Sequence, residues 1–269
     1  MLELSQTSVL ITESGSWLQR IQHNGQFYWA KHCTKKNGHI GDDAADNEWA
    51  SYSILREAGI RQIPLAQKYS FHGKEWLLTS EAPGQCLLDI TPPVGLEEAV
   101  FSLLQDLSSI HGTYFGSLTA TGPHFDSEYL LMCYMFEQRC PILQKEYAVL
   151  RQLLDLLPEP GTYTNEPVFV AYDLWKGNLF WSDSNRKLTV IDLERCFFTD
   201  NCAEGASLMG LFPAEILENR LCCNEPKKIA KMYLYRALFL LERIDFCEDQ
   251  IQADLLRQEL TNTLGKCLV

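Results

Sequence analysis

Residues 168–194, VFVAYDLWKGNLFWSDSNRKLTVIDLE, predict more about the fold and chemistry of this chain than any other stretch. Apolar, β-branched runs stand on both sides of the polar segment DLWKGN, a pattern typical of short buried strands joined by a loop. Asp173 and Asn178 lie in that loop, and Asp192 follows the second apolar run. Because a buried carboxylate is costly without a partner, acids at strand ends indicate a site where a ligand compensates their charge.

The first ninety residues predict a small antiparallel sheet. Residues 17–23 alternate polar and apolar side chains, and residues 26–33 follow after Asn24-Gly25, a strong signal for a hairpin turn. A helix is expected over residues 47–59, and a second hairpin over residues 69–80. Pro83-Gly84 then breaks the pattern and indicates a linker.

Helical periodicity dominates from about residue 95 onwards, apart from the strands described above. Helices are expected over residues 95–112, 127–147, 149–157, 213–221 and 226–246, and a last helix runs to about Leu264. The chain is therefore predicted to be an α+β protein of two lobes. Residues 1–82 form a small antiparallel-sheet N-lobe, and residues 83–269 form a larger, mainly helical C-lobe that carries one hairpin. Ligands favour the cleft between such lobes.

The composition excludes several classes of function. The 269 residues carry a formal net charge of −12, so general binding to nucleic acid or to an anionic membrane is not expected. No apolar run is long enough to span a membrane, and the N-terminus lacks the features of a signal peptide. The ten cysteines form no CxxC pair, which predicts a reduced, cytoplasmic protein without a zinc site.

Several polar residues together match the needs of phosphoryl transfer, which uses a cation on the phosphates and oxygen ligands for Mg²⁺. Lys31 lies on an otherwise apolar strand face, so its ammonium needs a partner, and Glu48 in the following helix is a candidate. Asn178 and Asp192 offer the hard oxygen atoms that Mg²⁺ prefers. The sequence therefore predicts a cofactor site for ATP and Mg²⁺.

Two further parts complete this predicted site. The turn that contains Gly15 and Ser16 offers backbone N–H groups and small side chains that let the chain approach a phosphate closely. Asp173 can accept the proton of an acceptor hydroxyl or fix that hydroxyl in place. Each part taken alone is more often an ordinary turn, surface charge or cap, and only their joint order along the chain favours a kinase.

This order resembles the protein kinase-like superfamily of aminoglycoside phosphotransferases and choline kinases. Within it, the loop AYDLWKGN is most similar to the HGDLWSGN loop of the fructosamine (ketosamine) kinase family, and Trp175 is informative because other branches usually have histidine there. Further segments resemble that family in register. They are FGSLTATG, YMFEQRCPILQ, AEGASLMGLFP and YLYRALFLLERIDF.

The resemblance implies a bilobal kinase-like fold and an ATP-dependent enzyme that phosphorylates hydroxyl groups of small sugar or ketosamine acceptors. It implies that Asp173 is the catalytic acid or base, that Asn178 and Asp192 bind Mg²⁺, and that Lys31 with Glu48 positions the phosphates. The implied hinge against adenine consists of Ser80, Glu81 and Ala82. His111 is expected to brace the catalytic loop.

The chain also departs from the family pattern. Ala171-Tyr172 replaces the His-Gly before the catalytic aspartate, and Leu193-Glu194 replaces Pro-Ala, which is nearer to the aminoglycoside enzymes. Glu204 lies one position before the place of a family acid. Two alternatives therefore stay open: a pseudokinase or nucleotide-binding module of the same fold, and an aminoglycoside- or choline-type phosphotransferase. The chain contains no hydrolase motif, and it lacks the activation segment of a protein kinase.

Overall fold

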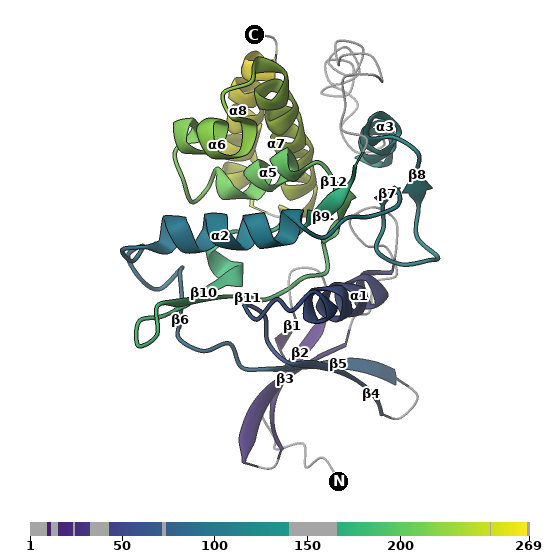
Figure 1. The fold of residues 1–269 in the computed structure, drawn as a ribbon, viewed down its shortest axis with the longest axis vertical. Helices are drawn as coiled ribbons and strands as arrows, with labels where there is room; N and C mark the ends of the chain where they lie inside the picture. Colours follow the sequence, from purple (N-terminus) through teal and green to yellow (C-terminus); the bar gives the residue numbers. More distant parts are fainter. Residues whose placement is uncertain are drawn as a thin grey trace. The chain divides into compact units, whose positions relative to one another are not determined.

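The computed structural model describes residues 10–11, 16–23, 25–32, 43–71, 74–139, 166–247 and 249–267 (Figure 1). By its internal contacts the chain forms two compact units. The first comprises Met1–Asp106, Ser117–Gly122 and Lys176–Cys196, and the second comprises Leu107–Gly116, Pro123–Trp175 and Phe197–Val269. Beyond residue 82 the first unit thus also includes residues 83–106, 117–122 and 176–196, and the division into lobes after residue 82 stays a prediction.

The first unit contains an antiparallel sheet with the strand order β1-β2-β3-β5-β4 in the described part of the chain. Its strands are β1 (Leu10–Ile11), β2 (Trp17–His23), β3 (Gln26–His32), β4 (Ala66–Phe71) and β5 (Lys74–Ser80). The predicted hairpin is confirmed, because β2 pairs with β3 from His23 opposite Gln26, and Gly25 between them has a φ of 76°. This left-handed backbone is the one a tight hairpin turn requires.

Helix α1 (Ala44–Glu57) follows this hairpin in the first unit, as the sequence predicts. Asp43 caps its start by accepting hydrogen bonds from the backbone N–H groups of Ala45 and Asp46. The helix ends just before Gly59, whose φ of 80° is typical of a helix terminus. Most of helix α2 (Leu96–Ser108) belongs to the same unit.

A second sheet of the first unit has the order β11-β10-β6. It consists of β6 (Gln85–Cys86), β10 (Leu179–Ser182) and β11 (Lys187–Val190), with the short helix η2 (Lys176–Asn178) directly before β10. Gly84 leads into β6 with a φ of 97°, and a Cβ atom there would lie 2.1 Å from the backbone oxygen of Trp181. The predicted linker thus approaches β10 more closely than any side chain allows.

Gly84→Ala is expected to destabilise the protein by about 2–4 kcal/mol, because it combines a left-handed backbone with a clash against a backbone oxygen. Gly59→Ala is the matched control. It has a similar positive φ but nothing within 4 Å of the added Cβ atom, so about 1 kcal/mol is expected. Urea unfolding of both variants measures the difference, and equal losses of stability would contradict the close approach at Gly84.

The second unit has its own small sheet with the order β8-β7-β12-β9. Its strands are β7 (Phe115–Gly116), β8 (His124–Phe125), β9 (Val168–Val170) and β12 (Phe197–Thr199). Among the described residues, the helices of this unit are α3 (Glu128–Arg139), η3 (Asn201–Glu204), α5 (Gly205–Leu208), α6 (Ala214–Cys222), α7 (Pro226–Phe246) and α8 (Gln250–Cys267). Helices α7 and α8 lie side by side (Figure 1), and α7 is buried along most of its length.

The fold differs from the expectation for the opening stretch of the sequence analysis. The apolar runs around DLWKGN enter two sheets, because β9 pairs with β12 while β10 pairs with β11. His111 is exposed, and its backbone bridges to Val168 of β9, so its role in bracing the catalytic loop stays a prediction. The helix expected over residues 149–157 lies outside the described residues.

Two expectations concern the environment of the chain. None of the helices among the described residues is long and apolar enough to cross a membrane. The cysteines that the structure describes are all free thiols. The α+β fold class predicted from the sequence is confirmed, with antiparallel sheets and a large helical part.

Candidate functional site

Lys31 of β3 is the centre of an ionic cluster in the first unit. Its ammonium lies 2.9 Å from Glu48 Oε2, 2.6 Å from Asp192 Oδ1 and 2.7 Å from Glu194 Oε2. The contact predicted with Glu48 is present, and Asp192 joins it. Glu194 was not predicted as a member, although the spacing Asp-x-Glu after a strand is visible in the sequence. The ammonium therefore holds three carboxylates from two different parts of the chain.

The β10–β11 hairpin brings the two predicted metal ligands to the same end of one ladder. Leu179 pairs with Val190, and the N–H of Ile191 donates to the carbonyl oxygen of Asn178 at 3.0 Å. Facing residues of an antiparallel ladder lie about 5 Å apart, so the backbones of Asn178 and Asp192 lie close together. Asp192 has a φ of 58°, a left-handed conformation that aspartate tolerates better than most residues.

Helix α1 fixes the backbone that carries the two acids. Asn47 donates from Nδ2 to the carbonyl oxygens of Glu194 at 3.0 Å and Cys196 at 2.7 Å. Ser51, one turn later, donates to the carbonyl oxygen of Leu193 at 2.9 Å. Both side chains are buried, so these bonds are shielded from water. The segment after Asp192 is thereby held on the same helix that supplies Glu48.

The cluster carries more negative than positive charge. One ammonium faces three carboxylates, and burial raises the pKa of Glu48 to about 7, although Lys31 opposes this rise. Asp192 and Glu194 raise the same pKa further. Asp192 is 40% exposed, which leaves it accessible to a ligand from solution. One oxygen each of Glu48, Asp192 and Glu194 lie within 4.8 Å of one another, a donor set that suits a hard divalent cation.

The predicted nucleotide-contacting residues are placed only in part. Gly15 lies outside the described residues, whereas Ser16 is described and buried. Ser80 ends β5, where its N–H donates to the carbonyl oxygen of Leu65 at 2.8 Å and its hydroxyl accepts from the N–H of Leu65 at 3.0 Å. Its own N–H is therefore used within the sheet.

Glu81 follows Ser80 and pairs with Arg20 of β2. Arg20 Nε lies 2.6 Å from Glu81 Oε1, and its guanidinium also lies over the ring of Phe27 at 3.9 Å. Both partners of the ion pair are more than a third exposed, so the pair adds little stability. Ala82, the last predicted hinge residue, is half-buried.

The loop around Asp173 belongs to the second unit and is held by side chains from the segment after β12. Glu204 accepts hydrogen bonds from the N–H groups of Ala171 at 2.7 Å and Tyr172 at 3.1 Å, one on each carboxylate oxygen. Ser207 accepts from the N–H of Leu174 at 2.9 Å. Because these bonds lie on both sides of Asp173, they fix the backbone that carries its carboxylate.

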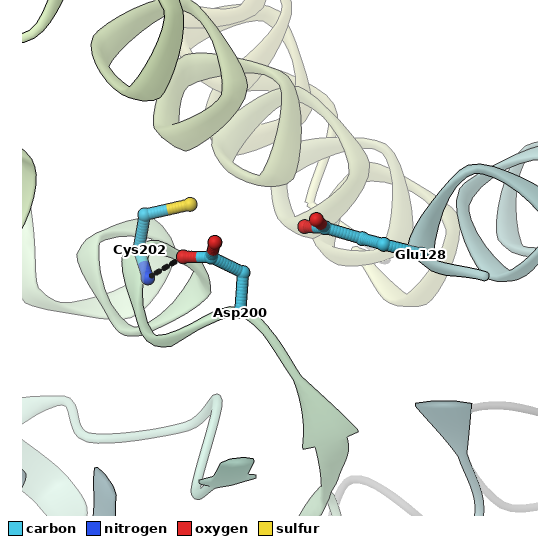
Figure 2. A group of neighbouring side chains, drawn as sticks. All are labelled: Glu128, Asp200 and Cys202. Atoms are coloured by element: carbon cyan, nitrogen blue, oxygen red, sulfur yellow. Dashed lines mark hydrogen bonds between the residues drawn. The ribbon is translucent and has the colours of Figure 1, made fainter. Parts of the chain in front are cut away.

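A second group of candidate metal ligands lies in this unit (Figure 2). Figure 2 shows Glu128, Asp200 and Cys202 directed toward one another, and their ligand atoms lie within 4.8 Å. The ammonium of Lys231 already lies there, 2.9 Å from Glu128 Oε2 and 2.6 Å from Asp200 Oδ2. All four side chains are buried. The group is therefore a buried ion-pair cluster that joins α3, η3 and α7 rather than a metal site.

Two buried glutamates of the second unit should make the stability of the protein depend on pH. Burial raises the pKa of Glu128 and of Glu204 to about 7, against the opposing effect of their hydrogen-bond donors. The folded state therefore keeps protons that the unfolded chain, with glutamate pKa values near 4.5, has released. The stability from these protons is present at low pH and is lost as the pH rises through about 7.

We expect the free energy of unfolding to be lower at pH 8 than at pH 5.5 by about 2 kcal/mol or more. Urea denaturation at the two pH values measures this difference. Glu204→Gln removes one of the titrating groups and should show a smaller difference than the wild type. A stability that is flat or rises between pH 5.5 and 8 would contradict the raised pKa values.

Comparison with known protein families identifies the chain. The family described as "Phosphotransferase enzyme family" (APH) matches residues 6–247, which include every predicted site residue. The chain belongs to this phosphotransferase family. A search of curated protein sequences found no match. The predicted kinase that transfers phosphate to a hydroxyl acceptor is confirmed at the level of the family.

Several solved structures share the fold of this phosphotransferase. A putative fructosamine-3-kinase from Haemophilus somnus 129PT has a TM-score of 0.68 at 14% identity, covering 98% of this chain and 92% of its own. A second, from Thermobifida fusca YX-ER1, has a TM-score of 0.63 at 19% identity, covering 99% and 94%. A thermostable mutant of the aminoglycoside phosphotransferase APH(4)-Ia, in a ternary complex with AMP-PNP and hygromycin B, has a TM-score of 0.66 at 15% identity, covering 98% and 92%. At these identities they show the fold, which is the predicted kinase-like one.

Proposed function

We propose that this phosphotransferase uses ATP and Mg²⁺ to phosphorylate a hydroxyl group of a small sugar or amino-sugar acceptor of the ketosamine kind. The observation that carries this proposal is the cluster in which Lys31 holds Glu48, Asp192 and Glu194. Such a cluster supplies a fixed cation for phosphate oxygens beside a carboxylate donor set for a metal ion.

The residues present fit Mg²⁺. Their donors are carboxylate oxygens, with the amide of Asn178 at the same end of the β10–β11 ladder, and the negative charge around Lys31 exceeds the positive charge. When bound, Mg²⁺ would neutralise negative charge on the phosphate oxygens. Lys31 would donate to those oxygens, while Glu48 would keep its ammonium in place.

The remaining nucleotide contacts are assigned to the N-terminal part of the chain. The turn containing Gly15 and Ser16 would offer backbone N–H groups to the phosphates. Because the N–H of Ser80 already bonds Leu65, adenine contacts would come from Glu81 and Ala82 instead. The salt bridge between Arg20 and Glu81 would keep the carboxylate turned toward β2.

Asp173 would accept the proton of the acceptor hydroxyl during transfer. Its role depends on positioning, which the hydrogen bonds to Glu204 and Ser207 supply. Trp175, two residues later, is half-buried and offers an aromatic surface of the kind that lines small-molecule sites.

The similar structures suggest a shared acceptor chemistry. They include proteins named for fructosamine, an aminoglycoside and ethanolamine, and each of these compounds bears an amine. The net charge of −12 favours the approach of such cationic molecules. The scattered cysteines further support a reducing, cytoplasmic location.

Thermal unfolding with and without nucleotide tests the cofactor assignment. ATP with Mg²⁺ at a hundredfold excess over Kd stabilises a protein by about 2.7 kcal/mol, which corresponds to a rise in Tm of about 5 °C for a chain of this size. ATP without Mg²⁺ should give a smaller rise. If neither ATP nor ADP raises Tm at millimolar concentration, the proposal fails. A rise in Tm without turnover on any acceptor would instead favour a non-catalytic nucleotide-binding protein.

A further inference from the structure

Tyr172 is the residue where this chain departs most from the loop it resembles, because a bulky side chain replaces glycine directly before Asp173. Its φ of 59° lies in the left-handed region, which glycine adopts freely and a tyrosine adopts at a cost. The side chain is nonetheless fully buried. A strained backbone persists only where the surroundings hold it, so the contacts of this ring must supply that support.

The ring of Tyr172 packs edge-on against three other aromatic rings of the second unit. The centroid distances are 5.2 Å to Phe197, 5.8 Å to Phe239 and 6.3 Å to Tyr235. Its hydroxyl donates to the backbone carbonyl oxygen of Tyr235 at 3.0 Å, inside helix α7. The Tyr172 side chain therefore anchors the Asp173 loop to both β12 and α7.

Tyr235 in turn is fixed by the buried ion-pair cluster of Figure 2. Its hydroxyl donates to Glu128 Oε1 at 2.9 Å and lies 2.5 Å from the hydroxyl oxygen of Thr199. Glu128 is held by Lys231, which also binds Asp200. A continuous set of hydrogen bonds and aromatic contacts thus runs from the Asp173 loop to Glu128 at the start of α3, and the side chains that form it are all buried.

We propose that Tyr172 is a positioning residue, whose hydroxyl and ring hold the backbone of the Asp173 loop in the orientation that phosphoryl transfer requires. Glu204 holds the backbone of the same loop through the N–H groups of Ala171 and Tyr172. The tyrosine at the place of the family glycine then supports the loop. This inference rests on the proposed function, because it assigns a catalytic role to Asp173.

Two variants of Tyr172 separate positioning from space filling. Tyr172→Phe removes only the hydroxyl and is expected to lower kcat about tenfold, with the KM for ATP within about twofold. Tyr172→Gly relieves the left-handed strain but removes the ring, and is expected to lower kcat about 100-fold. Wild-type kcat in both variants would overturn the proposal.

Tyr233→Phe is the matched control. Tyr233 lies on the same helix α7 and is buried, although its hydroxyl is less buried than that of Tyr172. This hydroxyl donates to Glu218 Oε1 at 2.6 Å and accepts from Lys266 at 3.0 Å, and no described hydrogen bond links it to Tyr172 or to the cluster of Figure 2. It should lose stability to a similar degree and keep kcat within about twofold of the wild type. A loss of kcat as large as that of Tyr172→Phe would show a general effect of stability and would overturn the assignment.

Amide hydrogen exchange gives a readout that needs no activity. The N–H groups of Ala171, Tyr172 and Leu174 should exchange at least about tenfold faster in Tyr172→Phe than in the wild type. Their exchange rates should be unchanged in Tyr233→Phe. Unchanged exchange in Tyr172→Phe would overturn the inference even in an active enzyme. Faster exchange in Tyr172→Phe, together with a wild-type protein that phosphorylates no acceptor, would support the loop anchor while refuting the proposed function.

Discussion

Asp173→Asn is expected to lower kcat by about 10³-fold while leaving the affinity for ATP with Mg²⁺ within about twofold of the wild type. The amide keeps the size of the side chain but cannot accept the proton of an acceptor hydroxyl. The backbone of the loop should stay in place, because Glu204 and Ser207 hold its N–H groups on both sides of Asp173.

Steady-state kinetics and nucleotide titration measure the two quantities separately. Asp254→Asn is a suitable control, since it removes an exposed carboxylate of the second unit that lies on α8. It should leave both kcat and the nucleotide affinity unchanged. If Asp173→Asn kept more than a tenth of the wild-type kcat, Asp173 would not be the catalytic base.

Asp192→Asn is expected to weaken the binding of ATP about 100-fold in the presence of Mg²⁺ and to have little effect in its absence. Asparagine is chosen because it tolerates the left-handed backbone at this position, where φ is 58°. The substitution removes one charge from the carboxylate set around Lys31 and leaves Glu48 and Glu194 in contact with the ammonium.

Isothermal titration with and without Mg²⁺ measures this difference. Asp183→Asn is the matched control in the same β10–β11 hairpin, because the exposed Asp183 accepts only the indole N–H of Trp181 among its described contacts. An equal loss of affinity with and without Mg²⁺ in Asp192→Asn would show that Asp192 affects ATP binding through its charge and not as a ligand of the metal ion.

Local sequence signals predicted the elements that position the site. Asn24-Gly25 set the hairpin that carries Lys31, and Gly59 marked the end of the helix that carries Glu48. Both signals are glycines, which favour the left-handed backbone that a hairpin turn or a helix end requires, so they can be recognised from the residue type alone. The pairing of Lys31 with Glu48 followed because an ammonium on an apolar strand face needs a partner.

The sequence did not predict which acids meet at longer range. Glu194 reaches Lys31 only because α1 binds the backbone of residues 193–196 through Asn47 and Ser51. Glu204 was visible as an acid one position from the family pattern, but its bond to a loop more than thirty residues away depends on the packing of η3. The sequence showed Tyr172 only as a replacement for a family glycine, whereas the structure buries it among aromatic rings.

Transfer of the γ-phosphate is the most direct test of the proposed function. The protein is incubated with γ-¹⁸O-labelled ATP and Mg²⁺ against a panel of ketosamines, amino sugars, aminoglycosides and amino alcohols, and the products are identified by mass spectrometry. We predict one class of acceptor that gains a labelled phosphate on a hydroxyl oxygen, with the signal lost in Asp173→Asn and in the absence of Mg²⁺. Nucleotide binding without any labelled acceptor, or transfer that persists in Asp173→Asn, would contradict the account.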